Sequence, residues 1–164
     1  MTFLLRRSLV RCAGLAMLAL ALFALPAGPG AKAATPEEAK ALVKKAIEHW
    51  KDVGREQAMK DFNSGEKPWI DPPLYVIVYD DDGHFYTHVN PGLRDVNLWD
   101  LQDINGKYVV RGMVDAAVSN ENGGWTNYVW QNPANGKQEQ KWTWCEEHDG
   151  MIIGVGAYGQ DPTP

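Results

Sequence analysis

The end of the chain constrains the fold most, because three strand-like segments follow one another there with only short turns between them. Trp125–Gln131, Gln138–Glu146 and Met151–Tyr158 contain the aromatic and β-branched residues typical of strands. The turn-forming sequences Asn132–Gly136 and Asp149–Gly150 separate them. Connections of hairpin length join antiparallel strands, whereas parallel strands need a longer crossover. We therefore predict an antiparallel sheet.

A long amphipathic helix is predicted before the sheet. Thr35 is a suitable N-cap, Pro36 fits the first helical position, and Glu38 completes a capping box. Apolar residues then recur at helical spacing, and Gly54 is a point where the helix could divide into two pieces. This stripe consists of Ala39, Leu42, Val43, Ala46, Ile47, Trp50, Val53, Met59 and Phe62.

Two further strands and a short helix complete the pattern. A stiff connector, Pro68–Pro73, leads into the strand Leu74–Tyr79, and the turn Asp80–Gly83 leads back along the strand His84–Val89. After a loop, Val109–Val118 has the apolar spacing of a short helix. An antiparallel sheet packed by helices is an α+β fold. We predict a five- to six-stranded antiparallel sheet with a long N-terminal helix and a short helix over the sheet.

The first 33 residues have the order of a secretory signal peptide. A basic start precedes an apolar run from Cys12 to Leu25, and small residues then lead to a cleavage site after Ala33. This run is short against the roughly 20 residues of a spanning helix, so no stable membrane insertion is expected. We expect export, by the Sec or the twin-arginine route, to the periplasm or the medium. The mature domain then joins the helix and connector, residues 34–73, to the sheet region, residues 74–161.

The charge balance argues against two classes of partner. Cleavage removes four of the 16 basic residues and none of the 21 acidic ones, which leaves a net charge of −9. A chain this acidic is a poor candidate for binding nucleic acid or anionic lipid.

Reactive and metal-binding motifs are missing from the sequence. Cys145 is the one cysteine after cleavage, so no intramolecular disulfide is possible, and a buried apolar thiol is expected. The run Asp80–Asp82 lacks the alternate spacing and closing glutamate of an EF-hand, and a hairpin turn explains it better. No G-x-S-x-G elbow is present. We predict no catalytic residues, no metal site and no cofactor.

Aromatic residues in one strand are candidates for a ligand pocket. Because side chains alternate along a strand, Tyr128 and Trp130 share one face and Trp125 takes the other. Small-molecule pockets are lined by such rings together with a few polar groups. The same rings could instead fill the core between the sheet and a helix.

Lys141 is the strongest polar candidate. It lies mid-strand, where a lysine on a covered face would need an anionic partner such as a ligand carboxylate. It could also be solvated on an open face, or paired with Glu139 or Glu147. His88 could donate to a ligand oxygen, and strand alternation places it on one face with Tyr86.

From Leu74 onward, several short motifs occur in an order that is typical of one family. They are Leu74–Tyr79, Asp82-Gly83, Thr87-His88, Asn90–Leu93, Asn97–Asp103, Asn105–Lys107, Gly123–Trp130, Asn132-Pro133, Lys141 and Ile153–Tyr158. With these motifs the chain resembles the single Cache type 2 family of extracytoplasmic sensor domains. It departs from the family's usual pattern at Asp95, where glycine is common, at Val89 after His88, and at Met151, near the usual aromatic residue.

The resemblance implies a PAS-like fold with a pocket between the sheet and the loop–helix segment. It implies small organic ligands such as short carboxylates, and it places a histidine at His88 and a lysine at Lys141. Such domains usually sit in chemoreceptors and histidine kinases, so a membrane receptor or kinase is an expected partner. A homodimer through the long helix is compatible with the family.

Three hypotheses follow for function. In the first, the chain is an exported sensory module of signal transduction that binds a small anionic metabolite through His88, Tyr86, Tyr128, Trp130, Lys141 and Trp125. In the second, side chains fill the pocket and an exposed aromatic patch binds an envelope protein. In the third and weakest, it is an enzyme of unrecognised type. Whether the pocket is open separates the first two.

Overall fold

A computed structural model of the protein describes residues 33–162. The predicted signal peptide, residues 1–33, lies outside the described residues except for Ala33. The helical elements are α1 (Pro36–Val53), α2 (Arg55–Phe62), the 3-10 turn η1 (Pro91–Leu93) and α3 (Val109–Val118). The strands are β1 (Ile70–Asp71), β2 (Leu74–Tyr75), β3 (Ile77–Tyr79), β4 (His84–Thr87), β5 (Val96–Asn97), β6 (Gly124–Gln131), β7 (Gln138–His148) and β8 (Met151–Tyr158).

The N-terminal helix begins at the predicted capping box and divides at the predicted glycine. The Thr35 hydroxyl accepts a hydrogen bond from the backbone N–H of Glu38, and the Glu38 carboxylate accepts one from the backbone N–H of Thr35. Gly54 has a φ of 80°, in the left-handed region that glycine tolerates, and it separates α1 from α2. No helix within residues 33–162 combines the length and apolar character needed to cross a membrane.

Six strands form one antiparallel sheet in the order β5-β4-β3-β8-β7-β6, and β1 pairs with β2 separately. This arrangement confirms the predicted α+β fold. Some strand bounds were predicted wrongly. The strand expected over Leu74–Tyr79 is divided between β2 and β3, and β5 lies in a segment expected to be a loop. Pairing with β4, with His84 opposite Asn97, defines β5. Its own two residues carry too little local pattern to predict it.

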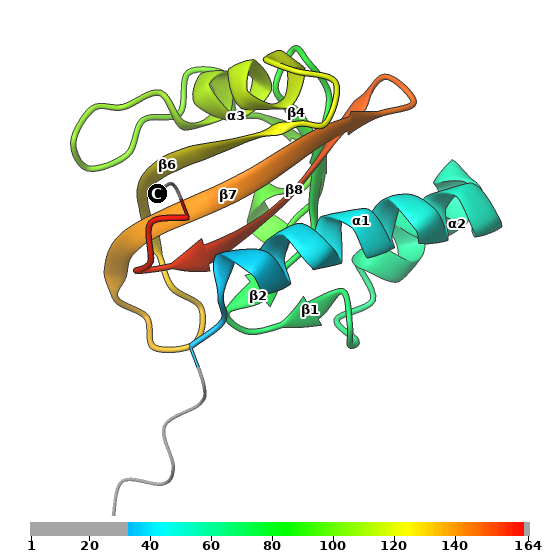
Figure 1. The fold of residues 1–164 in the computed structure, drawn as a ribbon, viewed down its shortest axis with the longest axis horizontal. Coiled ribbons are helices and arrows are strands. Elements are labelled where there is room, and N and C mark those ends of the chain that lie inside the picture. The colour runs from blue at the N-terminus through cyan, green and yellow to red at the C-terminus, as the bar shows by residue number, and fades with distance from the viewer. Residues whose placement is uncertain (1–32, 163–164) are drawn as a thin grey trace, which may run out of the picture. The chain divides into compact units, whose positions relative to one another are not determined.

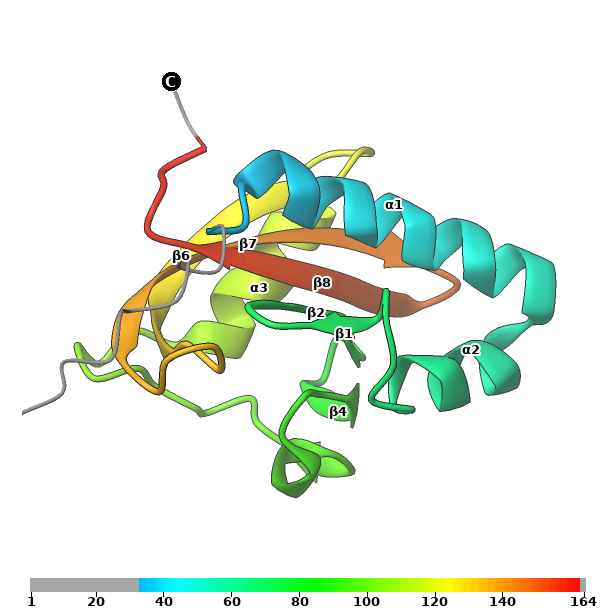
Figure 2. The same cartoon turned by 90° about the horizontal axis from the view of Figure 1, so that it is seen from below.

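The sheet has a core on each face. Helix α1 packs on one face of β7 and β8, and α3 packs on the opposite face over β6 and β7 (Figures 1 and 2). We call these faces the α1 side and the α3 side. Alternate side chains of β8 pack into the two cores: Ile153 and Val155 pack on the α1 side, and Ile152 packs on the α3 side.

Candidate functional site

A cavity of about 10 Å³ lies on the α3 side, between the strands and the loop and helix that cover them. This volume is close to the minimum that one water molecule needs. Four predicted ligand-binding residues line it together: His88, Tyr128, Trp130 and Lys141. Most of the remaining wall is apolar; the other lining residues are Tyr75, Ile77, Phe85, Leu93, Leu98, Leu101, Val109, Val110 and Met113.

Lys141 reaches the cavity because a glycine on the neighbouring strand leaves room for it. The lysine lies mid-strand in β7, opposite Tyr158, and its exposed fraction is 1%. A Cβ atom at Gly156 would lie 2.2 Å from Lys141 Cε and 2.9 Å from its Cγ. The side chain therefore lies in a hollow over the β8 backbone. The sequence left open whether Lys141 is buried, solvated or paired with an acidic residue. The structure shows that it is buried, and neither Glu139 nor Glu147 forms an ion pair with it.

The ammonium of Lys141 is surrounded by aromatic groups. Its Nζ donates a hydrogen bond to the Tyr75 hydroxyl at 2.7 Å. It also lies 4.0 Å from the ring centroid of Tyr75, 5.4 Å from that of Tyr158 and 6.0 Å from that of Tyr128. Cation–π contacts of this kind contribute about 0.5–2 kcal/mol. None of the ion pairs within residues 33–162 involves Lys141, so the buried charge has no acidic partner there.

His88 supplies a neutral donor at the same cavity. Its Nδ1 accepts a hydrogen bond from the backbone N–H of Asn90 at 3.0 Å, which places the ring proton of the neutral form on Nε2. Burial, and next the positive charge of Lys141, lower the pKa of His88 to about 3. The imidazole is therefore uncharged at neutral pH. The Arg94 side chain fixes the local backbone, because its Nε donates to the His88 carbonyl at 2.8 Å.

Two buried tyrosines add neutral hydroxyl groups to this region. The hydroxyl of Tyr128 lies 2.9 Å from that of Thr143, and the hydroxyl of Tyr158 donates to the Gln131 carbonyl at 3.0 Å. Burial raises the pKa of both tyrosines above the ordinary value. These phenols therefore hydrogen-bond without providing a negative charge to balance the lysine.

Two of the predicted ligand-binding residues lie elsewhere. The prediction that Tyr86 and His88 share a face is wrong, because β4 ends at Thr87 and the chain turns to bring the Asn90 N–H to His88. Tyr86 packs on the α1 side, and its hydroxyl donates to Asp80 at 3.1 Å. Trp125 also packs on the α1 side, in an edge-to-face contact with Trp144. Neither Tyr86 nor Trp125 lines the cavity.

A wider cleft of about 300 Å³ adjoins the cavity. Tyr75, His88, Leu93 and Trp130 line both spaces, so they form the boundary between them. His88 makes edge-to-face contacts with Tyr75, at 5.1 Å between centroids, and with Trp130, at 6.3 Å. The residues that line only the outer cleft are Val89, Asn90, Gln131, Pro133 and Gln138.

Tyr75 is the main site residue that the sequence prediction missed. It is 1% exposed, contacts the Lys141 ammonium and borders both spaces. A signal for it was present, since strand alternation places Tyr75 on one face with Ile77 and Tyr79. That alternation did not tell which face carries the cavity.

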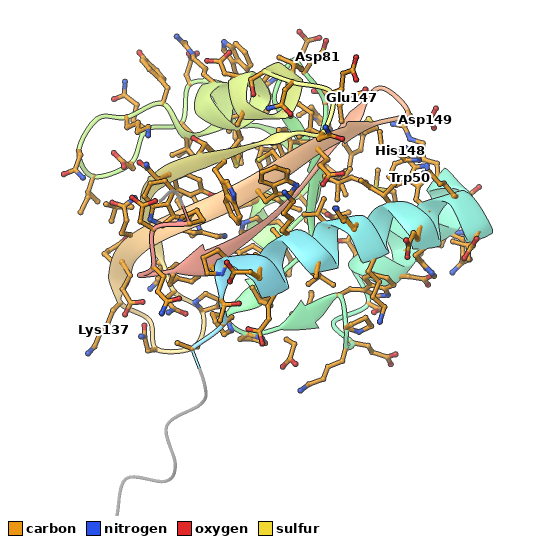
Figure 3. All side chains as sticks on the ribbon, in the orientation of Figure 1. Trp50, Asp81, Lys137, Glu147, His148 and Asp149 are labelled. Carbon is orange, nitrogen blue, oxygen red and sulfur yellow. The ribbon has the colours of Figure 1, made fainter. Side chains whose placement is uncertain are left out.

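Cys145 and His148 make contacts that stabilise the fold. Cys145 is buried, the Tyr79 hydroxyl lies 3.5 Å from its sulfur, and burial raises the pKa of the thiol to about 12. His148 packs edge-to-face on Trp50 of α1, 5.9 Å between ring centroids (Figure 3). Within residues 33–162, no three histidine, cysteine or acidic side chains come together in a way that could hold a metal ion.

The fold and this site define a class of protein: an α+β domain with a small buried cavity between its antiparallel sheet and a loop–helix cover. The model of the family described as single Cache domain 2 matches residues 30–163, and the chain belongs to this family. Domains of this family are extracytoplasmic sensory modules that bind small ligands. The family and its fold are those of sensory ligand-binding domains and not of enzymes.

Solved structures of sensor domains share the fold. A methyl-accepting chemotaxis protein from Vibrio parahaemolyticus is 26% identical, with a TM-score of 0.64 and coverage of 74% of this chain and 86% of the other. A periplasmic sensor domain of a chemotaxis protein is 21% identical, with a TM-score of 0.61 and coverage of 74% and 92%. A Cache chemosensory domain described as recognising carboxylic acids is 21% identical, with a TM-score of 0.62 and coverage of 76% and 92%. None of the curated proteins compared with the chain matches it.

Proposed function

We propose that this protein is an exported sensory module that binds a small carboxylate, with the Lys141 ammonium as the counter-charge. The observation that carries the proposal is the burial of this ammonium against Tyr75 without an acidic partner within residues 33–162. An ion taken out of water costs several kcal/mol unless an opposite charge and hydrogen bonds compensate it. A ligand anion would supply that opposite charge.

The other polar groups at the cavity suit the same ligand. His88 is neutral and presents its Nε2–H as a donor, and its Nε2 has no hydrogen-bond partner within residues 33–162. The Tyr75 hydroxyl lies 2.7 Å from Lys141 Nζ, so an anion near the ammonium would also meet a phenol. One cation and two neutral donors around an apolar space favour a carboxylate over an amine, because no acidic residue among residues 33–162 lines the cavity.

One structural neighbour has a ligand of the proposed class. One neighbour is described as recognising carboxylic acids through a Cache chemosensory domain. At 21% identity that neighbour establishes the fold alone for the present chain, and the charge at Lys141 provides the chemical argument.

The cellular setting belongs to the same proposal. The mature protein begins after Ala33, forms one domain over residues 34–161, and acts in the periplasm or outside the cell. Ligand binding shifts the population of a conformation that a membrane receptor or kinase recognises. A homodimer through α1 is compatible with this role.

The test is a calorimetric and thermal-shift screen of the purified protein against short carboxylates and, as the opposite class, short amines. A ligand at 100 times its Kd adds about 2.7 kcal/mol to the free energy of unfolding, enough to raise Tm by several degrees. Carboxylates should stabilise the parent and an exposed-lysine variant, Lys44→Met, equally. Stabilisation by amines alone would reject the proposed ligand class.

The small size of the cavity favours one alternative. At about 10 Å³ the space is nearly filled by the protein's own side chains, as expected for a module that binds another protein instead of a metabolite. In that case no member of the screen would raise Tm, and the next experiment would identify envelope proteins that bind the domain.

A further inference from the structure

We propose that the ligand is bipartite: a carboxylate head reaches Lys141 through the inner cavity, and an uncharged, hydrogen-bonding tail occupies the outer cleft. This inference rests on the proposed function and adds the second half of the ligand. Its basis is that two spaces of very different size lie on either side of one boundary of side chains.

The size argument comes first. The inner cavity has about 10 Å³, room for one water-sized group. The outer cleft has about 300 Å³, at the lower end of the range for ligand pockets. A carboxylate group alone fills the inner space. The remaining atoms of an acid therefore have to lie beyond the boundary, in the outer cleft.

The same four side chains border both the inner cavity and the outer cleft. Tyr75, His88, Leu93 and Trp130 line both of them. Tyr75 also accepts the hydrogen bond from Lys141, so the ammonium lies one side chain behind the boundary. A carboxylate that passes His88 can accept from its Nε2–H while the attached carbon chain continues outward between the rings.

The composition of the outer cleft defines the tail. None of the five residues found only there carries a charge, and three of them are amides: Asn90, Gln131 and Gln138. Within residues 33–162, the side chain of Gln138 makes no hydrogen bond, which leaves its amide available. Together with the Trp130 ring, these residues suit an uncharged tail that bears an amide or hydroxyl group.

The experiment compares three acids on the parent protein by calorimetry: propionate, hexanoate and N-acetyl-β-alanine. The last two have the same number of atoms along the chain, and they differ by one amide. One additional hydrogen bond contributes about 1 kcal/mol, so N-acetyl-β-alanine should bind about fivefold more tightly than hexanoate, and both should bind more tightly than propionate.

Variants assign the effect to the cleft. Gln138→Leu keeps the size of the side chain and removes its amide, so it should remove the advantage of N-acetyl-β-alanine over hexanoate and leave propionate unchanged. Gln57→Leu, at an exposed glutamine of α2, is the matched control and should change none of the three affinities.

The outcomes separate this inference from the proposed function. If propionate binds as tightly as the two longer acids, or if Gln138→Leu leaves the amide advantage intact, the bipartite ligand is rejected while carboxylate binding stands. If none of the three acids binds, the proposed function and the inference fail together.

Discussion

Replacement of Lys141 by methionine should weaken carboxylate binding without weakening the ligand-free protein. Methionine keeps much of the length and apolar volume of the lysine side chain and removes the ammonium. In the ligand-free protein the ammonium is buried with the Tyr75 hydroxyl and aromatic rings but no carboxylate, within residues 33–162. Exchange of a buried ion pair for apolar groups is commonly neutral or stabilising, by up to about 4 kcal/mol, and an ammonium without a carboxylate has less compensation than such a pair.

The loss of affinity can be estimated from the same geometry. A hydrogen bond to a charged group contributes about 1.5–3 kcal/mol, and the raw attraction between unit charges 4 Å apart at an effective dielectric constant of 20 is about 4 kcal/mol. Desolvation of the ligand anion offsets part of this attraction. We therefore expect Lys141→Met to raise Kd by roughly 10- to 100-fold.

Two measurements on one sample check this prediction. Calorimetry gives Kd for a carboxylate, and denaturant unfolding without ligand gives the free energy of unfolding. Lys44→Met, on the exposed face of α1, is the control and should match the parent in both. An affinity within twofold of the parent would refute the electrostatic role of Lys141. A loss of more than about 2 kcal/mol of ligand-free stability would mean that the charge is already compensated in the fold.

Three further predictions concern other residues. Gly156→Ala places a methyl group 2.2 Å from Lys141 Cε, so it should displace the ammonium and raise the carboxylate Kd at least tenfold. The control Ala157→Gly should lower the free energy of unfolding and leave the carboxylate Kd unchanged. The folded pKa of His88 is lowered to about 3 from an unfolded value near 6.5. The side chain is therefore neutral in both states above pH 6.5, and the free energy of unfolding falls as the pH drops from 6.5 towards 3, because only the unfolded chain binds the proton there. His88→Asn should therefore flatten the decline in unfolding free energy between pH 6.5 and 4; an unchanged slope would reject the shift. Cys145 should resist alkylation in the native protein and react after unfolding, as measured on its own peptide by mass spectrometry, because burial raises its thiol pKa to about 12.

Local patterns in the sequence were sufficient for most of the fold. The short helix α3 and the last strand β8 have the predicted bounds, Val109–Val118 and Met151–Tyr158. The capping box at Thr35 and the break at Gly54 were also predicted correctly. In each case the signal comes from residues within one turn of helix or one strand, so no distant partner is needed to define the element.

The wrong predictions concern segments whose structure depends on contacts with distant parts of the chain. The two residues of β5 become a strand because β4 lies beside them. Strand alternation placed Tyr86 and His88 together, but it holds only while the strand continues, and β4 ends at Thr87. Alternation also separated Tyr128 from Trp125 correctly, yet it could not show which side of the sheet carries the cavity.

The site therefore depends on an asymmetry between the two sides of the sheet. On the α1 side of β8, Ile153, Val155 and Ala157 are fully buried and pack against the helix, so that side is a core. On the α3 side, Gly156 occupies the place of a side chain, and the hollow it leaves holds the Lys141 stem. The same strand thus stabilises the fold with one set of residues and positions a buried charge with the other. A substitution that fills the hollow should therefore impair binding before it unfolds the domain.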